Sequence, residues 1–572
     1  MMRNAEIAEL LYNISKLLEL KGENLFKIRA YAKAARAIEG MTQDIEIIAA
    51  DNKLEDIPGV GESIAQKIGE YLRTGKVESF EELKKQVPQG FHELMKIPGI
   101  GPRTVQFLHN ELRIKSVEEL EKAAGEHRLK RLSHFGAVKE KNILKAIQRY
   151  RQRSTRIPLG TAISIVEEII KGLKDSGSIE KIEAAGSLRR RKENVGDIDI
   201  LATSKDAAAA IEVFVHLPHT EEILGKGSTK ATIITREAIQ VDLRIVDGKS
   251  FGTSMQYFTG SKEHNIKLRE LAKQKGFKLS EYELEEISTG RKLYFESDDE
   301  VYEKLGLIPI PPEIREDSGE IEAALSGKLP DLVRIEDITG DFHVHTDWSE
   351  GKNTILEMVD GARKLGYEYI AITDHSKALG VAHGMDEEKL LKQIEEIHTL
   401  NDELTNFKVF SGIEVDIKAD SSLDLPGSIL KQCDVVVAAL HTSQKQPRRE
   451  IMSRLIAAME NENVDIIAHP TGRIIGKREA YDLDIEMLLD TAADTGTVLE
   501  INAHPARLDI GDANVRKAKN KGIKIAIGTD AHNTGHLGFM KFGVDVARRG
   551  WLEKKDLMNT RSAKELKFKD DS

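Results

Sequence analysis

Three aspartates have the residue type and spacing of a divalent-metal site. Asp197 and Asp199 are separated by one isoleucine, and Asp242 lies between a valine and a leucine further along the chain. Side chains alternate between the two faces of a β-strand, so Asp197 and Asp199 point the same way, and Asp242 would join them from a neighbouring strand. Carboxylates this close repel one another without cations, and they suit Mg²⁺ or Mn²⁺. Two such ions can clamp the attacking and leaving oxygens of a phosphoryl transfer.

A phosphate-binding turn is expected directly before this triad. Residues 186–192 read Gly-Ser-Leu-Arg-Arg-Arg-Lys. Arginine forks and backbone N–H groups suit phosphate oxygens, although a basic turn can also be merely solvated. An Asp-x-Asp pair alone is usually surface charge. Its combination with this turn and with a third aspartate predicts a nucleotidyl-transfer site in which all three carboxylates are catalytic.

A second group of metal-ligand types lies in residues 339–572. Seven apolar, β-branched segments there end in polar residues, mostly histidines. Polar residues at the C-terminal ends of parallel strands are where barrel enzymes place their chemistry, and a His-x-His pair can share an ion. A single strand-end histidine is usually structural, but several at one edge, with Glu414 and Asp530, predict a metal centre. The polar ends lie at residues 342–345, 372–375, 412–414, 439–441, 467–469, 500–502 and 528–532.

Two similar glycine turns precede amphipathic helical stretches near the start of the chain. Residues 57–61 read Ile-Pro-Gly-Val-Gly and residues 97–101 read Ile-Pro-Gly-Ile-Gly. Glycine permits tight turns, and the following helix start offers backbone N–H groups that can hold a DNA phosphate without reading a base. Two copies resemble helix-hairpin-helix DNA-binding motifs, whereas residues 132–136 are a weaker echo that could be only a structural repeat. The four glycines expected at DNA are Gly59, Gly61, Gly99 and Gly101.

Composition narrows the class of protein. One cysteine, Cys433, excludes an intrachain disulfide, and no apolar run is long enough for a membrane span, so we expect a reducing, cytoplasmic location without membrane association. The net charge is −11, but residues 1–160 hold 28 Lys and Arg against 22 Asp and Glu, a balance of +6 that leaves −17 for the rest. A basic front and an acidic, ligand-rich rear suit DNA bound at one end and metals held elsewhere.

Residues 1–315 resemble an X-family DNA polymerase of the DNA polymerase beta type, because these motifs occur together and in the family's order. The resemblance implies that the three aspartates bind two Mg²⁺ or Mn²⁺ ions and that Asp242 helps to activate the primer 3′-hydroxyl. Residues 257–261, Tyr-Phe-Thr-Gly-Ser, match the family's platform for the nucleotide sugar. Asn265 and Arg269, four residues apart on one helix face, match contacts to the incoming base and the template. The implied nucleotide-binding residues are Arg156, Gly186, Ser187, Arg190, Tyr257, Phe258, Gly260, Asn265 and Arg269.

The sequence departs from the beta enzyme at two places. Gln240 stands two residues before Asp242, where the beta enzyme has an arginine, so the electrostatic support of that aspartate is expected to differ. In the small amino-terminal domain, Lys27 and Tyr31 match positions near a 5′-phosphate, and Lys67 matches a lysine that can form a Schiff base with an abasic sugar. Serines replace two basic neighbours there, at positions 63 and 79. Neighbouring positive charge is one way to activate such a lysine, so we expect 5′-phosphate binding rather than lyase chemistry.

The second half resembles the PHP (polymerase and histidinol phosphatase) family, which folds as a distorted seven-stranded β/α barrel around a di- or trinuclear metal centre. The resemblance implies two or three Mn²⁺ or Zn²⁺ ions and hydrolysis of phosphoesters. Glu350 is one methylene longer than the aspartate common in the family. Arg473 and Arg507, near two strand ends, either steer a DNA phosphate or are ordinary loop arginines. The implied ligands are His343, His345, Glu350, His375, Glu414, His441, His469, Asp530 and His532.

These patterns predict a multidomain α/β chain with helical helix-hairpin-helix domains, a nucleotidyltransferase palm with a mixed sheet, and a distorted (βα)7 PHP barrel. We expect a monomeric, nucleoid-associated DNA-directed DNA polymerase that binds gapped or primer–template DNA and dNTPs and fills short gaps in base excision repair. Its barrel would supply 3′→5′ exonuclease activity, with 3′-phosphodiesterase and abasic-site incision as further candidates. The expected divisions are 1–80 (first hairpin domain), 81–155 (second hairpin domain), 156–255 (palm), 256–315 (nucleotide-selecting subdomain), 316–338 (linker) and 339–572 (PHP domain).

Three alternatives stay open at this point. The barrel could be a catalytically silent scaffold, which its near-complete ligand set disfavours. It could also be a small-molecule phosphatase of the histidinol-phosphate type, which its attachment to DNA-binding hairpins disfavours. The front half could transfer nucleotides to RNA or to a small molecule, which residues 257–261 and the hairpin turns disfavour.

Overall fold

The structure is a computed structural model, and it divides the chain into two compact units, Met1–Ser154 and Thr155–Ser572. In the second unit it describes every residue from 156 to 568 except 379–382. In the first unit the residues outside the description are 1–6, 8–9, 13, 16, 19–22, 40–44, 51–52, 58, 75–76, 87–89, 96, 98–99, 133–134, 137–138, 145 and 148–154.

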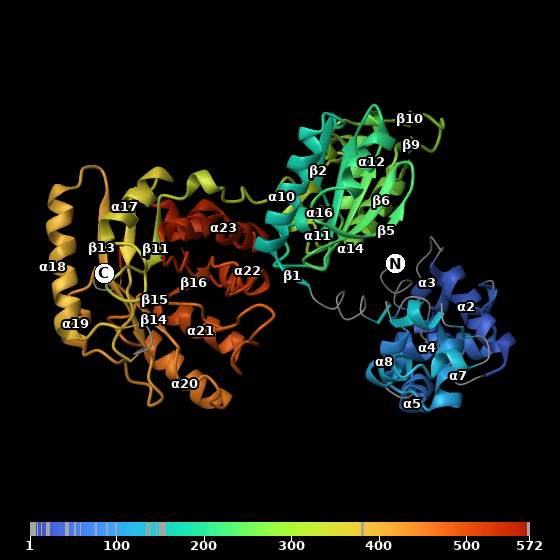
Figure 1. Ribbon diagram of the computed structural model, residues 1–572, viewed down its shortest axis with the longest axis horizontal. Coiled ribbons are helices and arrows are strands. Elements are labelled where there is room, and N and C mark those ends of the chain that lie inside the picture. Colours follow the sequence, from blue (N-terminus) through green and yellow to red (C-terminus); the bar gives the residue numbers. More distant parts are fainter. Residues whose placement is uncertain are drawn as a thin grey trace. The chain divides into compact units, whose positions relative to one another are not determined.

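The first unit is helical (Figure 1), and its three glycine turns share one hydrogen-bonding pattern. In each turn the fourth residue's N–H donates to the carbonyl of the first residue, at 2.9 Å from Val60 to Ile57, 3.1 Å from Ile100 to Ile97 and 3.1 Å from Phe135 to Leu132. The described residues of the segment 132–136 therefore share this hydrogen bond with the two Pro-Gly turns, and Ser133 and His134 lie outside the described residues. The helices are α2 (Leu25–Glu39), α3 (Ile45–Ala50), α4 (Glu62–Thr74), α5 (Glu78–Gln86), α6 (Gly90–Leu94), α7 (Pro102–Leu112) and α8 (Val117–Gly125).

The palm of the second unit is a five-stranded mixed sheet in the order β2-β4-β7-β6-β5. β4 and β7 run parallel, and the other neighbours are antiparallel. A short β1–β3 pair precedes the sheet, and α10 and α12 contribute to its apolar core. The elements are β1 (Ile157–Pro158), α10 (Leu159–Asp175), β2 (Lys181–Ala184), α11 (Gly186–Arg189), β3 (Asn194–Val195), β4 (Asp197–Thr203), α12 (Ala207–Val215), β5 (Thr220–Lys226), β6 (Lys230–Thr235) and β7 (Gln240–Ile245).

A small subdomain follows the palm and is held together by buried polar networks. Asp298 accepts hydrogen bonds from Arg189 at 2.6 Å and from the fully buried Arg315 at 2.7 Å. His264 lies 2.6 Å from a carboxylate oxygen of Glu320, and both side chains are buried. The elements are α13 (Phe251–Thr259), α14 (Lys262–Gln274), β8 (Phe277–Leu279), β9 (Leu284–Glu286), β10 (Lys292–Leu293), α15 (Asp298–Lys304) and α16 (Glu320–Leu325).

The rest of the second unit is a barrel of seven parallel strands in chain order, with helices outside it (Figure 1). A parallel bridge between Val344 and Ala531 brings the last strand beside the first. Val435 and Val437 on β14 face the barrel interior, whereas Val436 packs toward the helices. The strands are β11 (Gly340–Val344), β12 (Tyr369–Ile372), β13 (Lys408–Asp416), β14 (Val435–Ala439), β15 (Ile466–Ile467), β16 (Val498–Asn502) and β17 (Ile525–Gly528). The helices are α17 (Ile355–Lys364), α18 (Glu387–Glu403), α19 (Gly427–Leu430), α20 (Arg448–Met459), α21 (Ile485–Thr495), α22 (Asp512–Asn520) and α23 (Met540–Arg549).

The expected fold class is confirmed. The first unit has the helical hairpins, the palm has the mixed sheet, and the C-terminal part has the seven-stranded barrel. The palm and the barrel pack directly against each other within one compact unit: a Cβ added to Gly160 of α10 would lie 2.9 Å from a side-chain carbon of Pro505. Among the described helices, none combines the length and apolar character needed to cross a bilayer.

Two candidate metal centres

Strands β4 and β7 place the three aspartates at one site. Asp199 and Asp242 are partners in the register of these strands, and Asp197 lies opposite Gln240. The alternating apolar residues on both strands are buried, which fixes the carboxylates on the other face. Burial, with the negative charges of Asp197 and Asp242, raises the pKa of Asp199 to about 6. A cation would relieve this repulsion, so the residues fit the divalent metals that the sequence predicts.

Gln240 does not leave Asp242 without support. The Gln240 amide donates to one carboxylate oxygen of Asp242 at 3.2 Å, and the Lys230 ammonium on β6 lies 3.3 Å from the other oxygen. Arg244, two residues beyond Asp242, acts electrostatically on Asp199 and lies 4.7 Å from the centroid of the Phe258 ring. Positive charge therefore reaches the triad from β6 and from Arg244. Sequence reasoning missed Lys230 because its approach to Asp242 depends on pairing between β6 and β7.

The turn before the triad has the geometry expected of its glycine. Gly186 has φ 60°, and a Cβ at this position would collide with a carboxylate oxygen of Asp199. Ser187 follows it and is half-buried. Arg190 donates from Nε to Glu316 at 3.1 Å and from Nη1 to the carbonyl oxygen of Thr259. The turn is thus packed against the aspartates on one side and against the small subdomain on the other.

Several of the expected nucleotide-binding residues gather next to this turn. A Cβ added to Gly260 would lie 2.9 Å from Nη1 of Arg190. Tyr257 and Phe258 are half-buried at the end of α13, and Arg269 is exposed on α14. The Asn265 amide donates to the carbonyl oxygen of Tyr257 at 2.7 Å, so this side chain anchors the end of α13 in the structure. Arg156 donates to the carbonyl oxygen of Asn194 at 3.3 Å, and its side chain lies 4.0 Å from the position of a Cβ added to Gly196, the residue before Asp197.

The expected 5′-phosphate residues line one pocket of about 250 Å³ in the first unit. Lys27 and Lys67 reach it from α2 and α4, and Tyr31 is buried in its wall. The Lys67 ammonium donates to the backbone and hydroxyl oxygens of Ser63, at 3.3 and 3.2 Å. Elsewhere in this unit Gly61 and Gly101 are exposed at helix starts, Gly59 has φ 94°, and Gly99 lies outside the described residues.

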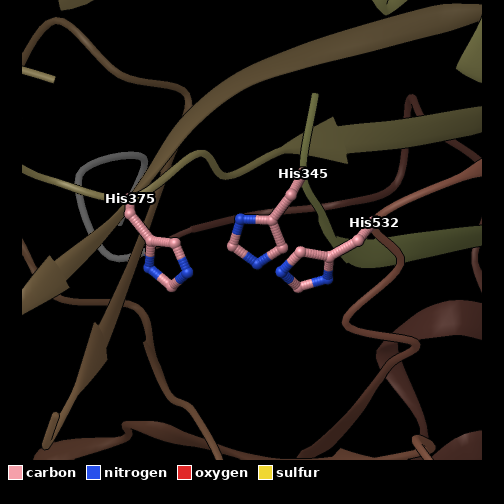
Figure 2. A group of neighbouring side chains, drawn as sticks. All are labelled: His345, His375 and His532. Carbon is pink, nitrogen blue, oxygen red and sulfur yellow. The ribbon is translucent and has the colours of Figure 1, made fainter. Parts of the chain in front are cut away.

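The histidines of the barrel converge at the C-terminal ends of its strands. Figure 2 shows the imidazoles of His345, His375 and His532 side by side, although they come from three separate segments. Each ring offers one nitrogen atom, and these three atoms all lie within 4.8 Å of one another. Two further groups meet the same criterion: His343 with His345 and Asp530, and His375 with Glu414 and His441. Because the groups share members, they form one continuous cluster suited to more than one ion.

Glu414 lies at the centre of this cluster. Its carboxylate oxygens lie within 3.6 Å of nitrogen atoms on five histidines. Burial alone would raise its pKa, but the surrounding histidines hold the pKa well below the usual value, so the group is a carboxylate. The five histidines are His343, His345, His375, His441 and His469.

Buried polar atoms of the cluster fit a bound metal. Both ring nitrogens of His345 and Nε2 of His343 are buried without a hydrogen-bond partner within the described part of the chain. Burial and the neighbouring His375 lower the pKa of His345 to about 3, which keeps this imidazole neutral as a ligand requires. Glu350, despite its extra methylene, reaches His375 at 3.2 Å and His532 at 2.9 Å. Every ligand that the sequence predicts therefore lies in or beside this cluster.

Acidic residues behind the cluster orient its histidines, and sequence reasoning missed them. Glu500 on β16 accepts from Nδ1 of His343 at 2.6 Å, and Asp416 on β13 lies 3.5 Å from Nδ1 of His441. Such partners fix the ring so that the other nitrogen faces the metal. The sequence identified residues 500–502 as one of the polar strand ends, but it could not show whether Glu500 binds a metal or supports a histidine. The hydrogen bond to His343 shows that Glu500 supports a histidine.

The two loop arginines differ in their surroundings. Arg473 lies 2.6 Å from Glu193 of the palm and bonds to backbone oxygens of Arg507 and Leu508, so it joins the palm to the barrel. Arg507 lies 3.5 Å from Asp530, at the metal cluster. Of the two, only Arg507 is placed to meet a substrate phosphate there.

Models of known protein families match segments in both halves of the chain. The model of the helix-hairpin-helix domain matches residues 2–77, and that of a SAM-like helix-hairpin-helix tandem matches 91–149. The DNA polymerase beta thumb matches 254–316, and the PHP domain matches 341–504.

Relatives match either the whole chain or its second half. A protein of Bacillus subtilis (strain 168) named DNA polymerase/3′-5′ exonuclease PolX is 40% identical over 567 residues, which cover 99% of each chain. A probable phosphatase of Thermoanaerobacter sp. (strain X514) is 32% identical over 232 residues, 38% of this chain and 89% of the relative. A probable phosphatase of Acetivibrio thermocellus is 30% identical over 207 residues, 35% of this chain and 81% of the relative.

Proposed function

Because the chain belongs to the PolX family of DNA polymerase/3′-5′ exonucleases, we propose that it fills short gaps in DNA and trims 3′ ends in its barrel. The observation that carries the proposal is the pairing of Asp199 with Asp242 beneath the Gly186 turn, in the same chain as a separate histidine cluster. Gap filling of this kind belongs to base excision repair.

For nucleotide addition, the palm and the small subdomain that follows it each have a defined task. Asp197, Asp199 and Asp242 would hold the divalent cations, and Asp242 would help to remove the proton of the primer 3′-hydroxyl. Gln240 and Lys230 fix the orientation of the Asp242 carboxylate. Ser187, Arg190 and Arg156 hold the triphosphate, and residues 257–260, with Asn265 and Arg269, select the nucleotide and meet the template. The primer 3′-oxygen attacks the α-phosphorus, and pyrophosphate leaves.

For hydrolysis at 3′ ends, the barrel supplies a ligand set and a phosphate contact. Glu414 and the histidines around it would hold the metals, and Arg507 beside Asp530 would orient the phosphodiester. In both halves, bound divalent cations would neutralise the reacting phosphate and activate the attacking oxygen. Hydrolysis that leaves a 3′-hydroxyl restores the group that the palm extends. Removal of 3′-blocking groups and incision at abasic sites are proposed on the same chemistry.

The first unit is proposed to bind the DNA on either side of the gap. Gly59, Gly61, Gly99 and Gly101 would present backbone N–H groups to phosphates. Lys27, Tyr31 and Lys67 would hold the 5′-phosphate. Ser63 offers the Lys67 amine oxygens rather than a neighbouring cation, which supports binding over lyase chemistry.

The remaining assignments complete the proposal. The palm would use two Mg²⁺ or Mn²⁺ ions, because its ligands are carboxylates. The barrel would use two or three Mn²⁺ or Zn²⁺ ions, because its imidazoles suit Zn²⁺ and its carboxylates suit Mn²⁺. The protein would act as a monomer in the nucleoid-associated cytoplasm.

One assay tests both activities. A duplex with a one-nucleotide gap and a labelled primer is incubated with the full chain and either Mg²⁺ or Mn²⁺, with and without dNTPs. We expect primers one nucleotide longer when dNTPs are present and shortened primers when they are absent. No extension with either metal would contradict the polymerase proposal. Hydrolysis of small phosphate esters but not of DNA would favour a small-molecule phosphatase, and hydrolysis of neither would favour a silent scaffold.

A further inference from the structure

The barrel holds the last residues of the triphosphate-binding turn and the residue that follows the turn. Arg191 lies 3.5 Å from Asp545 of α23, and Glu193 lies 2.6 Å from Arg473. The carbonyl oxygen of Arg190 accepts a hydrogen bond from Nη1 of Arg549, the last residue of α23, at 2.6 Å. Three of these four consecutive residues, 190–193, therefore contact side chains from the barrel.

Arg549 also contacts the carboxylate that orients Arg190. Glu316 accepts from Nε of Arg190 at 3.1 Å and from Nη1 of Arg549 at 3.2 Å, and Lys192 lies 3.4 Å from the same oxygen. Burial alone would raise the pKa of Glu316, but the three cations hold the pKa below its usual value, so Glu316 carries a charge at neutral pH. Glu316 thus connects a guanidinium of the barrel to a guanidinium of the nucleotide site.

Arg549 is itself fixed in place. Its side chain is 5% exposed, and its second terminal nitrogen lies 2.5 Å from Asp512 of α22. Nη1 also donates to the carbonyl oxygen of Glu313 at 3.1 Å. A guanidinium that bonds to acceptors in several directions holds them in a fixed mutual geometry, which a lysine ammonium on a flexible stem does more weakly.

We propose that Arg549 of the PHP barrel is a positioning residue for nucleotide addition, which acts by holding Glu316 and the backbone of Arg190 so that the Arg190 guanidinium meets the triphosphate. The barrel thereby contributes to nucleotide addition in the palm as well as to 3′-end hydrolysis at its own site. This inference rests on the proposed contact between Arg190 and the triphosphate.

The test compares steady-state nucleotide addition by full-length variants on gapped DNA. Arg549→Met should raise KM for dNTP about tenfold, the effect of losing a buried charge-assisted hydrogen bond, with kcat within about twofold. Hydrolysis of 3′ ends, measured on the same preparation, should stay within about twofold and reports that the barrel is folded. Arg549→Lys should restore part of the affinity.

A matched control separates positioning from general packing. Arg548 is the neighbouring arginine of α23, but it bonds to Glu313 and to the backbone of Val333 rather than to the turn. Arg548→Met should leave KM for dNTP within about twofold. Because Arg549 acts through Glu316, the effects of Arg549→Met and Glu316→Gln should not add.

The outcomes separate the positioning role of Arg549 from the proposed contact between Arg190 and the triphosphate. If Arg190→Ala leaves KM for dNTP unchanged, the proposed triphosphate contact is wrong. If Arg190→Ala raises KM but Arg549→Met does not, or if Arg548→Met raises it equally, the positioning role of Arg549 is wrong. If Arg549→Met does not fold, the same comparison is made with Arg549→Lys, which keeps the positive charge but loses the planar guanidinium with its several hydrogen-bond donors.

Discussion

Glu500 accepts a hydrogen bond from Nδ1 of His343 at 2.6 Å, and both side chains are almost fully buried. This contact fixes which nitrogen of His343 faces the metal cluster, since only one ring nitrogen can turn away from it. The second oxygen of Glu500 accepts from the backbone N–H of His469, so one carboxylate serves two of the expected ligands.

Glu500→Gln should weaken metal binding in the barrel. The amide cannot accept from both partners, and loss of such a supporting group costs about 10- to 100-fold in metal affinity. The measurement is the concentration of Mn²⁺ that gives half-maximal 3′-end hydrolysis. The matched control is Glu486→Gln, on α21, where the carboxylate pairs with exposed lysines. An unchanged metal requirement in Glu500→Gln would refute the supporting role.

The two metal centres should be separable by substitution. Asp242→Ala should abolish primer extension on gapped DNA, because the register partner of Asp199 is lost, while 3′-end hydrolysis continues. Asp247→Ala, in the exposed loop after β7, is the control and should extend normally. Continued extension by Asp242→Ala would disprove its catalytic assignment.

The converse variant tests the barrel. His343→Ala combined with His345→Ala removes two histidines that share Asp530 and Glu414. Hydrolysis of 3′ ends should fall below detection while nucleotide addition continues. If the variant shortens the primer as fast as the natural protein does, the nuclease site lies elsewhere in the chain.

Gly186→Ala should impair nucleotide addition more than it impairs folding. A left-handed backbone costs an alanine roughly 1–2 kcal/mol, and here the added carbon also meets Asp199. Gly177 has a similar φ of 69° with open space around its Cβ position, so Gly177→Ala bears the backbone strain alone. The melting temperature of Gly186→Ala should fall at least as far as that of Gly177→Ala, and only Gly186→Ala should lose primer extension. Equal activity in both would show that the Asp199 contact is unimportant.

Asp545 should make the stability of the second unit depend on pH. Burial raises its pKa to about 7, although Arg191, Arg548 and Lys541 favour the charged form. The native state then binds the proton more tightly than the unfolded chain does, so this contribution is complete below pH 4 and is lost as the pH rises toward about 7. The loss is up to about 1.4 kcal/mol per pH unit.

Two substitutions separate the effect of Asp545 on the pH dependence of stability from the effects of other groups. Asp545→Asn cannot titrate, so its melting temperature should fall less than that of the natural protein between pH 5 and pH 8. Asp494→Asn, at an exposed position of α21, should keep the natural pH dependence. If the melting temperatures of the natural protein and Asp545→Asn change with pH in parallel, the pKa of Asp545 is not raised in the native state.

Local patterns were sufficient to predict most of the fold and the members of both clusters. Strand alternation identifies Asp197 and Asp199 as neighbours on one face, and repeated strand ends identify the barrel histidines, because both signals lie within a few consecutive residues. The segment 132–136 was predicted as a weaker echo that could be only a structural repeat, and its described residues share one backbone hydrogen bond, from Phe135 to Leu132, with the two Pro-Gly turns.

Residues that act across elements could not be identified in this way. Lys230 approaches Asp242 through strand pairing, Glu500 approaches His343 across the barrel, and Arg549 lies hundreds of positions from Arg190 in the sequence. A lysine, a glutamate and an arginine at these positions look like ordinary polar residues until long-range packing is known. Gln240 illustrates the same limit, because its replacement of an arginine is visible in the sequence but the compensating charges are not.

The contacts of Arg473 and Asp545 with the palm bear on how this architecture can be re-engineered. A graft that brought in a PHP barrel from a stand-alone phosphatase would place foreign side chains against Glu193 and Arg191, whose present partners come from the barrel. The tight approach of Pro505 to Gly160 adds a requirement of shape to that of charge. The barrel therefore cannot be exchanged as an independent domain. A chimera would have to keep these palm–barrel contacts before its polymerase and nuclease activities could be compared with those of the natural protein.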